Sequence, residues 1–464
     1  MGMRGMWSVV VAASCAAAIA ASPAVVAAAG AGAGAAAPTP PTATAWWTAE
    51  MEALSLAWGR PVEQREVGLS AHAREEAARL RNLAFPAEDR SDFVGRPRLT
   101  LARFLPEIFE GDPWRSAWPA TESDGTHERI HFVNRNGAKL TGDLWGPPAT
   151  TCAPTARCAG ILVVEGGAGA SARAYWWAAQ TLAMAGYVVL TFDVQGQGES
   201  ETFGHDASGR IACMPPTAVP DDPAVLRELG SCGGVPSEQP ASFTLAAEDA
   251  YDWFVSAANP WAGRIDTATI GAAGHSWGAT AVTTLQDRRS IGAIVAWDWL
   301  SACPVDVAEH GVECPAPESH WIPARAPALD IEGDFLYWPL PRPPGTARDG
   351  RLEGFGHWSR AGVDVMTLVL RGGTHYDYAS VPLPLPALRD GQALAARFTR
   401  LWFDKYLRRD PSAAAALTAP AFRMQRWDPV GRTSTVDIDL STVLSTALDS
   451  ASRIDGVPKT AARH

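Results

Sequence analysis

The hydrophobic positions between residues 160 and 410 form short continuous apolar runs that alternate with longer stretches of helical period. The apolar runs, which we expect to be strands, are 160–167, 187–200, 265–274, 291–300, 326–334 and 364–372, and the strand within 187–200 leaves through a glycine-rich turn. The helical stretches are 171–187, 241–257, 277–288 and 390–409. Strands that are apolar on both faces and alternate with helices predict a mostly parallel central sheet flanked by helices, an α/β fold.

The pattern differs on either side of this alternating region. Between 128 and 148 the period is two, and Asn136-Gly137 between the two runs is typical of a β-hairpin turn. We expect an α/β domain at 126–410, with insertions at about 201–240 and 301–325. The flanking parts are a signal peptide and spacer at 1–37, an N-terminal helical extension packing on the core at 38–125, and a C-terminal extension at 411–464.

The N-terminus has the build of a secretory signal peptide. Arg4 is followed by an apolar run from Trp7, then by small residues and a spacer rich in proline and threonine. The alternative is a retained membrane anchor, but alanine and glycine are only weakly apolar. We therefore predict an extracellular protein whose mature chain has no stable membrane span.

Composition and charge narrow the function classes. The chain has 464 residues, of which 47% are hydrophobic and 19% charged, which is typical of a globular protein. Its formal net charge is -11, which argues against nucleic acid or an anionic membrane surface as the main partner. A small-molecule or polymeric substrate is the remaining expectation, and the oligomeric state stays open.

The cysteines of the mature chain fall into local couples. With Cys15 assigned to the signal peptide, an even number remains, which in an exported chain indicates disulfides. The favoured pairs are Cys152–Cys158, Cys213–Cys232 and Cys303–Cys314. No couple has a C-x-x-C spacing or a nearby pair of histidines, so we expect no metal site.

A candidate nucleophile lies between a predicted strand and a predicted helix. The segment Gly274-His275-Ser276-Trp277-Gly278 reads G-x-S-x-G, after the strand at 265–274. A sharp strand-to-helix turn needs small neighbours and pushes the serine hydroxyl above the carboxyl edge of the sheet. The alternative is an ordinary serine in a glycine-rich turn. The strand before it and the helix after it favour the nucleophile.

A base and an acid are expected further along the chain. His375 follows the last core strand on a glycine-containing loop, whereas His357 is a weaker rival. The acid is either Asp334 or Asp298, since both lie at carboxyl ends of strands and both keep the order nucleophile, acid, histidine. A serine hydroxyl needs such a base, and the acid orients the imidazole.

Two backbone amides are needed to bind the oxyanion of a tetrahedral intermediate. One is expected from Trp277, directly after the nucleophile, and the other from Gly167, after the strand at 160–167. The glycine-rich turn at 193–200 lacks the third glycine of a dinucleotide-binding motif and does not lead into a helix. We therefore expect no nucleotide and no other cofactor.

These residues together resemble the α/β-hydrolase superfamily over roughly 128–409. The blocks 175–193, 296–301, 332–334 and 372–375 are similar to those of secreted bacterial cutinases and polyester hydrolases. The resemblance implies Asp334 as the acid, Trp297 in the substrate cleft, and Gly167 and Trp277 in the oxyanion hole. This chain departs from those compact enzymes in its length and in its cysteine-bearing insertions.

A second resemblance favours the other acid. The runs 291–300 and 334–339 are similar to the platelet-activating-factor acetylhydrolase-like branch, in which the acid follows the earlier strand and would be Asp298. Both relatives cleave esters, so the implied function is a secreted serine hydrolase that cleaves carboxylic esters through an acyl-enzyme. The alternatives are a peptidase or amidase of the same fold and a non-catalytic binding protein.

Overall fold

The computed structural model describes most of the chain from residue 126 onward. The described residues are 126–166, 172–195, 197, 200–201, 204–205, 211–213, 240–303, 321–333, 349–371, 373–379, 388, 390–427, 433–444 and 450–459. The predicted signal peptide and the predicted N-terminal helical extension lie outside these residues, as do most of both predicted insertions.

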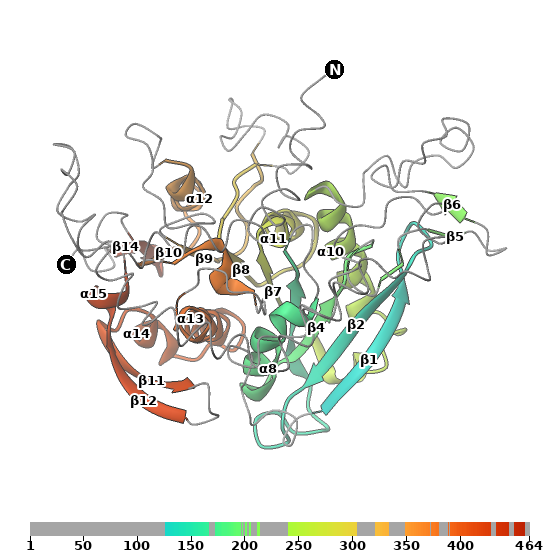
Figure 1. The fold of residues 1–464 in the computed structure, drawn as a ribbon, viewed down its shortest axis with the longest axis horizontal. Helices are drawn as coiled ribbons and strands as arrows, with labels where there is room; N and C mark the ends of the chain where they lie inside the picture. Colours follow the sequence, from blue (N-terminus) through green and yellow to red (C-terminus); the bar gives the residue numbers. More distant parts are fainter. Residues whose placement is uncertain are drawn as a thin grey trace, which may run out of the picture. The chain divides into compact units, whose positions relative to one another are not determined.

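A ten-stranded sheet forms the centre of the described region, in the order β1-β2-β4-β3-β7-β8-β9-β10-β13-β14 (Figure 1). Its strands are β1 (Thr126–Val133), β2 (Lys139–Gly146), β3 (Cys158–Val164), β4 (Val188–Phe192), β7 (Ile265–His275), β8 (Ala293–Trp297), β9 (Ala328–Gly333), β10 (Val365–Leu370), β13 (Ala451–Ile454) and β14 (Val457–Lys459). From β4 to β10 every neighbouring pair is parallel. The predicted α/β class with a mostly parallel sheet is therefore confirmed.

Helices cover both faces of this sheet (Figure 1). The short η2 (Ala172–Tyr175), α8 (Trp176–Met184) and α13 (Gly391–Tyr406) contribute to one core, together with Trp297 of β8. The other core includes residues of α10 (Pro240–Val255), α11 (Trp277–Arg288) and α12 (Asp349–Arg360). Because both faces are covered, central strands such as β4 and β8 are buried along their whole length.

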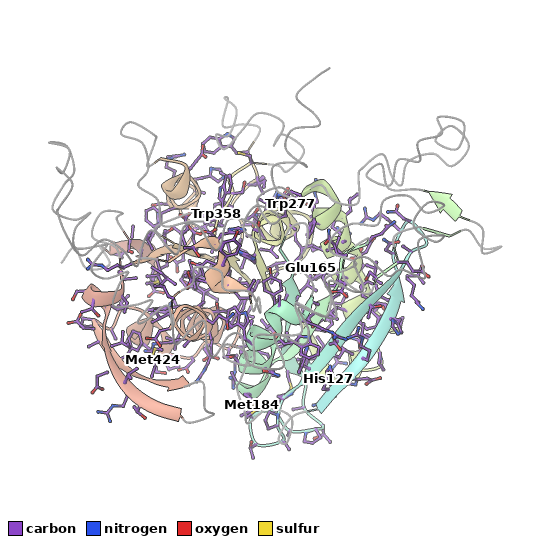
Figure 2. All side chains as sticks on the ribbon, in the orientation of Figure 1. His127, Glu165, Met184, Trp277, Trp358 and Met424 are labelled. Carbon is purple, nitrogen blue, oxygen red and sulfur yellow. A yellow bond between two sulfur atoms is a disulfide. The ribbon has the colours of Figure 1, made fainter. Side chains whose placement is uncertain are left out.

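The C-terminal segment completes one edge of the sheet. β13 pairs antiparallel with β10, and β14 pairs with β13. Before them, α14 (Ala413–Leu417), β11 (Ala421–Trp427), β12 (Thr433–Asp439) and α15 (Leu440–Val443) form a small helix and hairpin layer. Met424, labelled in Figure 2, belongs to the same core as α13. The segment is thus joined to the α/β core through β10.

One predicted disulfide is confirmed, and the others reach beyond the described residues. Cys152 and Cys158 are bonded, with their Cα atoms 6.2 Å apart, and Cys158 opens β3. Cys303 is also disulfide-bonded, but its predicted partner Cys314 lies outside the described residues. Cys213 ends the short β6 (Ile211–Cys213), which pairs with β5 (Gly204–His205), and Cys232 is not described.

Within the described part of the chain, no helix has both the length and the apolar character needed to cross a bilayer.

The predicted strands and helices of the core recur with small shifts at their ends. For example, the run at 326–334 contains β9, and the helix expected at 171–187 begins as the 3-10 turn η2 before α8.

Candidate active site

Ser276 occupies a strained turn between β7 and α11. Its φ is 55° and its ψ is -119°, a left-handed backbone that costs a non-glycine residue on the order of 1–3 kcal/mol. The turn is held by the backbone, because the Ser276 amide donates to the Trp297 carbonyl at 3.1 Å and its carbonyl accepts from Ala279 at 2.9 Å. The surrounding fold therefore keeps the serine in a conformation that it would not adopt by itself.

The two glycines of the pentapeptide are required by close packing. A Cβ on Gly274 would lie 2.2 Å from the carbonyl oxygen of Gly278, and a Cβ on Gly278 would lie 2.2 Å from the carbonyl oxygen of Glu165. Helix α11 thus begins directly against the end of β3, where Figure 2 labels Glu165 and Trp277. This contact brings the turn at Ser276 close to the segment that follows β3.

The amino end of α11 lies at this place. Trp277 is the first residue of the helix, so its N–H has no acceptor within the helix, whereas the Ala279 N–H already donates to the Ser276 carbonyl. The Ser276 side chain makes no capping hydrogen bond to the first-turn amides. The hydroxyl of the half-buried Ser276 therefore does not cap the helix. The amino end of the helix favours negative charge beside this hydroxyl.

Asp298 contacts His375 across the carboxyl edge of the sheet. The Asp298 Oδ2 atom is hydrogen-bonded to His375 Nδ1, and the two side chains are only 8% and 13% exposed. Asp298 directly follows β8 and has a φ of 59°, and Trp299 after it has a φ of 133°. The Asp298 amide donates to the Ile331 carbonyl at 2.7 Å, which anchors this second strained turn to β9.

A buried carboxylate supports the Asp298 turn from below. Asp330 on β9 is fully buried and accepts a hydrogen bond from the Leu300 amide at 3.1 Å and another from Thr367 Oγ1 at 3.3 Å. Burial raises the pKa of Asp330, and the nearby charge of Asp298 adds to that rise. The hydrogen bond from the Leu300 amide ties the residues after Asp298 to β9.

The loop that carries His375 is held rigidly. His375 opens the 3-10 turn η8 (His375–Tyr378), which begins with a reciprocal capping box between Thr374 and Asp377. The Thr374 amide donates to Asp377 Oδ2 at 2.6 Å, and the other oxygen of Asp377 accepts from the Leu388 amide at 2.6 Å. The position of the imidazole is thus set by hydrogen bonds on both sides of the loop.

A scan of family models finds no match for this chain, and a search of curated proteins finds no relative. What the protein does must therefore be inferred from the geometry of its site.

The candidate site residues are only partly within the described region. The structure places Ser276, Trp277 and His375 at the carboxyl edge of the sheet, together with the alternative acid Asp298. Asp334 and Gly167 lie outside the described residues, so their roles stay predictions.

The expected place of Trp297 in a substrate cleft is corrected by the structure. Its side chain is fully buried, its indole N–H donates to Thr399 Oγ1 of α13 at 3.0 Å, and its ring centroid lies 5.1 Å from that of Trp177. Neighbouring side chains on a strand point to opposite faces, and at this position the side chain enters the core beneath the sheet edge. Trp297 supports the Asp298 turn from within the core.

Two residues that the sequence did not assign to the site, His275 and Tyr175, contact each other, and His275 lies beside His375. The ring of His275 is 4.4 Å from that of His375, and its Nδ1 atom is 2.8 Å from the hydroxyl of Tyr175. Both His275 and Tyr175 are buried. The only sequence signal for His275 was its place next to the serine, and nothing local to Tyr175 indicated a polar contact with residue 275.

A pair of buried carboxyl groups flanks the segment after β3. Glu165 Oε1 accepts from the Val194 amide at 2.7 Å, and Asp193 Oδ1 accepts from the Ala172 amide at 2.7 Å. Burial raises the pKa of Glu165 well above its ordinary value and that of Asp193 to about 7. These contacts hold the residues on both sides of 167–171, the segment expected to contribute an oxyanion donor.

One group among the described residues has the donor atoms for a metal ion. His275, Asp298 and His375 each offer one ligand atom, and these atoms lie within 4.8 Å of one another. Two imidazoles and a carboxylate suit Zn²⁺. In the structure, however, Asp298 and His375 are bonded directly to each other, which is the arrangement that orients an imidazole for proton transfer.

Proposed function

We propose that the protein is a secreted serine hydrolase of the α/β-hydrolase fold, which cleaves carboxylic esters through Ser276, His375 and Asp298. The observation that carries the proposal is the Asp298–His375 hydrogen bond at the same sheet edge as the strained turn of Ser276. A left-handed serine at a strand-to-helix turn and an acid-paired histidine from a later loop are the parts that this chemistry needs.

The acid in this proposal is Asp298 rather than Asp334. Asp298 contacts His375 Nδ1, and its turn is anchored by a backbone hydrogen bond to β9. This choice agrees with the resemblance to the platelet-activating-factor acetylhydrolase-like branch and departs from the cutinase-like assignment. A carboxylate at Nδ1 fixes the tautomer in which Nε2 can accept a proton.

The reaction then proceeds in two halves. His375 Nε2 takes the proton of the Ser276 hydroxyl as Oγ attacks the ester carbonyl carbon, and the carbonyl oxygen becomes an oxyanion. The tetrahedral intermediate collapses to an acyl-serine, and the imidazolium gives its proton to the leaving alcohol. Water then attacks the acyl carbon while His375 accepts its proton. The second tetrahedral intermediate collapses, His375 gives this proton to Ser276 Oγ, and the carboxylic acid product leaves.

The oxyanion is stabilised by amides at the start of α11. Trp277 is the first residue of α11, so its N–H has no acceptor within the helix, and the helix end adds favourable electrostatic potential. The second donor is assigned to Gly167 from the sequence. Each such donor is worth roughly 100- to 1,000-fold in kcat in serine hydrolases.

The test of the serine nucleophile uses a fluorophosphonate probe and a panel of p-nitrophenyl esters and aminoacyl anilides. We expect labelling and ester cleavage in the native protein and neither in Ser276→Ala. Equal labelling of Ser276→Ala would refute the nucleophile. Cleavage of anilides without esters would instead make the protein an amidase or peptidase, since the same geometry serves both bonds.

The cluster of His275, Asp298 and His375 favours a second candidate function, a metal-dependent hydrolase. Dialysis against a strong chelator separates the two. We expect full ester hydrolysis by the metal-free protein, because the proposed mechanism needs only side chains and water. Activity that is lost on chelation and restored by Zn²⁺ would favour the metal-dependent function.

The extracellular location belongs to the same proposal. It is supported by the signal-like N-terminus and by the Cys152–Cys158 disulfide, which suits an oxidising compartment. N-terminal sequencing of the exported protein tests it. A mature chain that begins near residue 38 supports export with cleavage, whereas an intact Met1 in the cell fraction contradicts it.

A further inference from the structure

A buried chain of hydrogen bonds runs behind the proposed catalytic residues. The Gly166 amide donates to the hydroxyl of Tyr175 at 2.9 Å, and that hydroxyl is 2.8 Å from Nδ1 of His275. Tyr175 is 1% exposed and His275 is 4% exposed. The chain therefore joins the end of β3 to the residue that precedes Ser276, with no access for bulk water.

The donors of this chain determine its direction. An amide can only donate, so the Tyr175 oxygen accepts from Gly166. Among the described residues, His275 Nδ1 is the other partner of this hydroxyl, so Tyr175 gives its single proton to Nδ1. Burial raises the pKa of the Tyr175 hydroxyl, which therefore keeps that proton. We assign His275 from these partners as the tautomer with its proton on Nε2.

His275 is held neutral beside His375. Burial lowers the pKa of His275 well below its ordinary value, and the charge of His375 lowers it further, while the His375 backbone opposes the shift. Among the described residues, Nε2 of His275 has no hydrogen-bond partner of normal geometry, so this backbone contact is a weak one. The neutral ring of His275 packs 4.4 Å from the His375 ring and places no positive charge beside it.

Gly166 packs closely against the two side chains of this hydrogen-bond chain. A Cβ at position 166 would lie 2.6 Å from the Tyr175 oxygen and 2.8 Å from His275 Nδ1. Only glycine lets the backbone after β3 approach the two side chains so closely. The residue directly after Gly166 is the expected oxyanion donor.

We propose that Tyr175 and His275 are positioning residues, which together fix Gly166, after the end of β3, against the loop of His375. This inference rests on the proposed function, which makes His375 the general base and expects the oxyanion donor directly after Gly166. Their relative placement matters chiefly when charge develops on the substrate, so the pair acts on kcat rather than on substrate binding.

The first experiment compares Tyr175→Phe with Tyr187→Phe. Tyr187 is also fully buried, and its hydroxyl donates to Asp404 at 2.8 Å, away from the site. We expect Tyr175→Phe to lower kcat by roughly 100-fold while KM stays within about twofold, because a small misplacement of reacting groups has this effect. Tyr187→Phe should keep kcat. Equal kcat values in the two variants would overturn the proposal.

A second comparison uses two substitutions of His275. The side-chain oxygen of asparagine can accept the Tyr175 proton in place of Nδ1, whereas leucine cannot. We expect His275→Asn to retain most of the kcat that His275→Leu loses. The double variant Tyr175→Phe/His275→Leu should be no slower than His275→Leu, because both changes break one chain. Additive losses of kcat in the double variant, or equal losses of kcat in His275→Asn and His275→Leu, would contradict the role of this hydrogen-bond chain.

A readout without substrate separates this inference from the proposed function. The ¹⁵N resonances of His275 should show a neutral imidazole with its proton on Nε2 in the native protein and a changed Nδ1 signal in Tyr175→Phe. A proton on Nδ1 would refute the hydrogen-bond chain even in an active enzyme. A native protein that shows the expected signals but cleaves no ester would refute the proposed function, and the positioning role with it.

Discussion

At the scale of single residues, two strained backbones carry the proposed chemistry. Ser276 and Asp298 follow neighbouring parallel strands, and both have left-handed φ angles, 55° and 59°. The Ser276 amide is bonded to the carbonyl of Trp297, which directly precedes Asp298. The proposed nucleophile and the residue before the proposed acid are thus joined by one backbone hydrogen bond.

The exchange Asp298→Asn should be much more damaging than Asp334→Asn. An amide at position 298 would stabilise the wrong tautomer of His375, and in serine hydrolases such a change lowers kcat by about 10,000-fold. Steady-state ester hydrolysis and thermal unfolding of both variants provide the measurement. A severe kcat loss in Asp334→Asn with a mild one in Asp298→Asn would restore the cutinase-like assignment.

Asp193 should make stability depend on pH. Burial raises its pKa to about 7 from 3.8, although the hydrogen bond from the Ala172 amide opposes the rise. The folded state then holds a proton that the unfolded state releases, so this contribution is fully present below pH 3.8 and is lost as pH rises through about 7.

The measurement is the unfolding midpoint of the native protein and of Asp193→Asn at pH 5 and pH 8. The native protein should lose more stability than the variant between these values, because asparagine does not ionise. Identical pH dependence in both proteins would show that Asp193 is not protonated in the folded state at pH 5.

At the scale of elements, the contact between α11 and β3 sets the position of Ser276, the proposed nucleophile. Gly278→Ala would drive a Cβ to 2.2 Å from the Glu165 carbonyl oxygen, so the helix must move from the strand. We expect a loss of about 1–3 kcal/mol in unfolding free energy and a large fall in ester hydrolysis. The matched control is Gly263→Ala, since a Cβ at that position meets nothing within 4 Å.

Urea unfolding and initial rates on both glycine variants test this expectation. A Gly278→Ala protein with native activity would mean that α11 can shift without displacing Ser276, and the packing role of that glycine would then be discarded.

At the scale of the whole described region, the C-terminal strands belong to the main core. Ile454 on β13 is fully buried within the same core as α13, whereas Val457 on β14 is 58% exposed. Ile454→Ala should cost roughly 2–5 kcal/mol of unfolding free energy. Val457→Ala should stay within about 0.5 kcal/mol.

Equilibrium unfolding followed by tryptophan fluorescence and by circular dichroism distinguishes two arrangements. If the C-terminal strands unfold with the core, both probes report one transition that shifts in Ile454→Ala. A separate early transition, with the main one unchanged, would show that the segment is an independent unit.

The local pattern of the chain was sufficient for the class of fold and for the turn at Ser276. Buried strands, amphipathic helices and a G-x-S-x-G turn are encoded within about ten residues, because hydrophobic period and backbone sterics act over short distances. The Cys152–Cys158 disulfide could also be predicted from the sequence, because it closes a short loop.

Other features depended on contacts between segments far apart in the chain. The bond of Asp298 to His375 joins residues 77 positions apart, and the Tyr175–His275 contact spans 100 positions. The burial of Trp297 and the addition of β13 beside β10 likewise follow from how the strands are ordered. Hydrophobic pattern alone determined which segments become strands and helices, whereas strand order and register decided which side chains meet at the sheet edge, because those contacts exist only after the strands have paired.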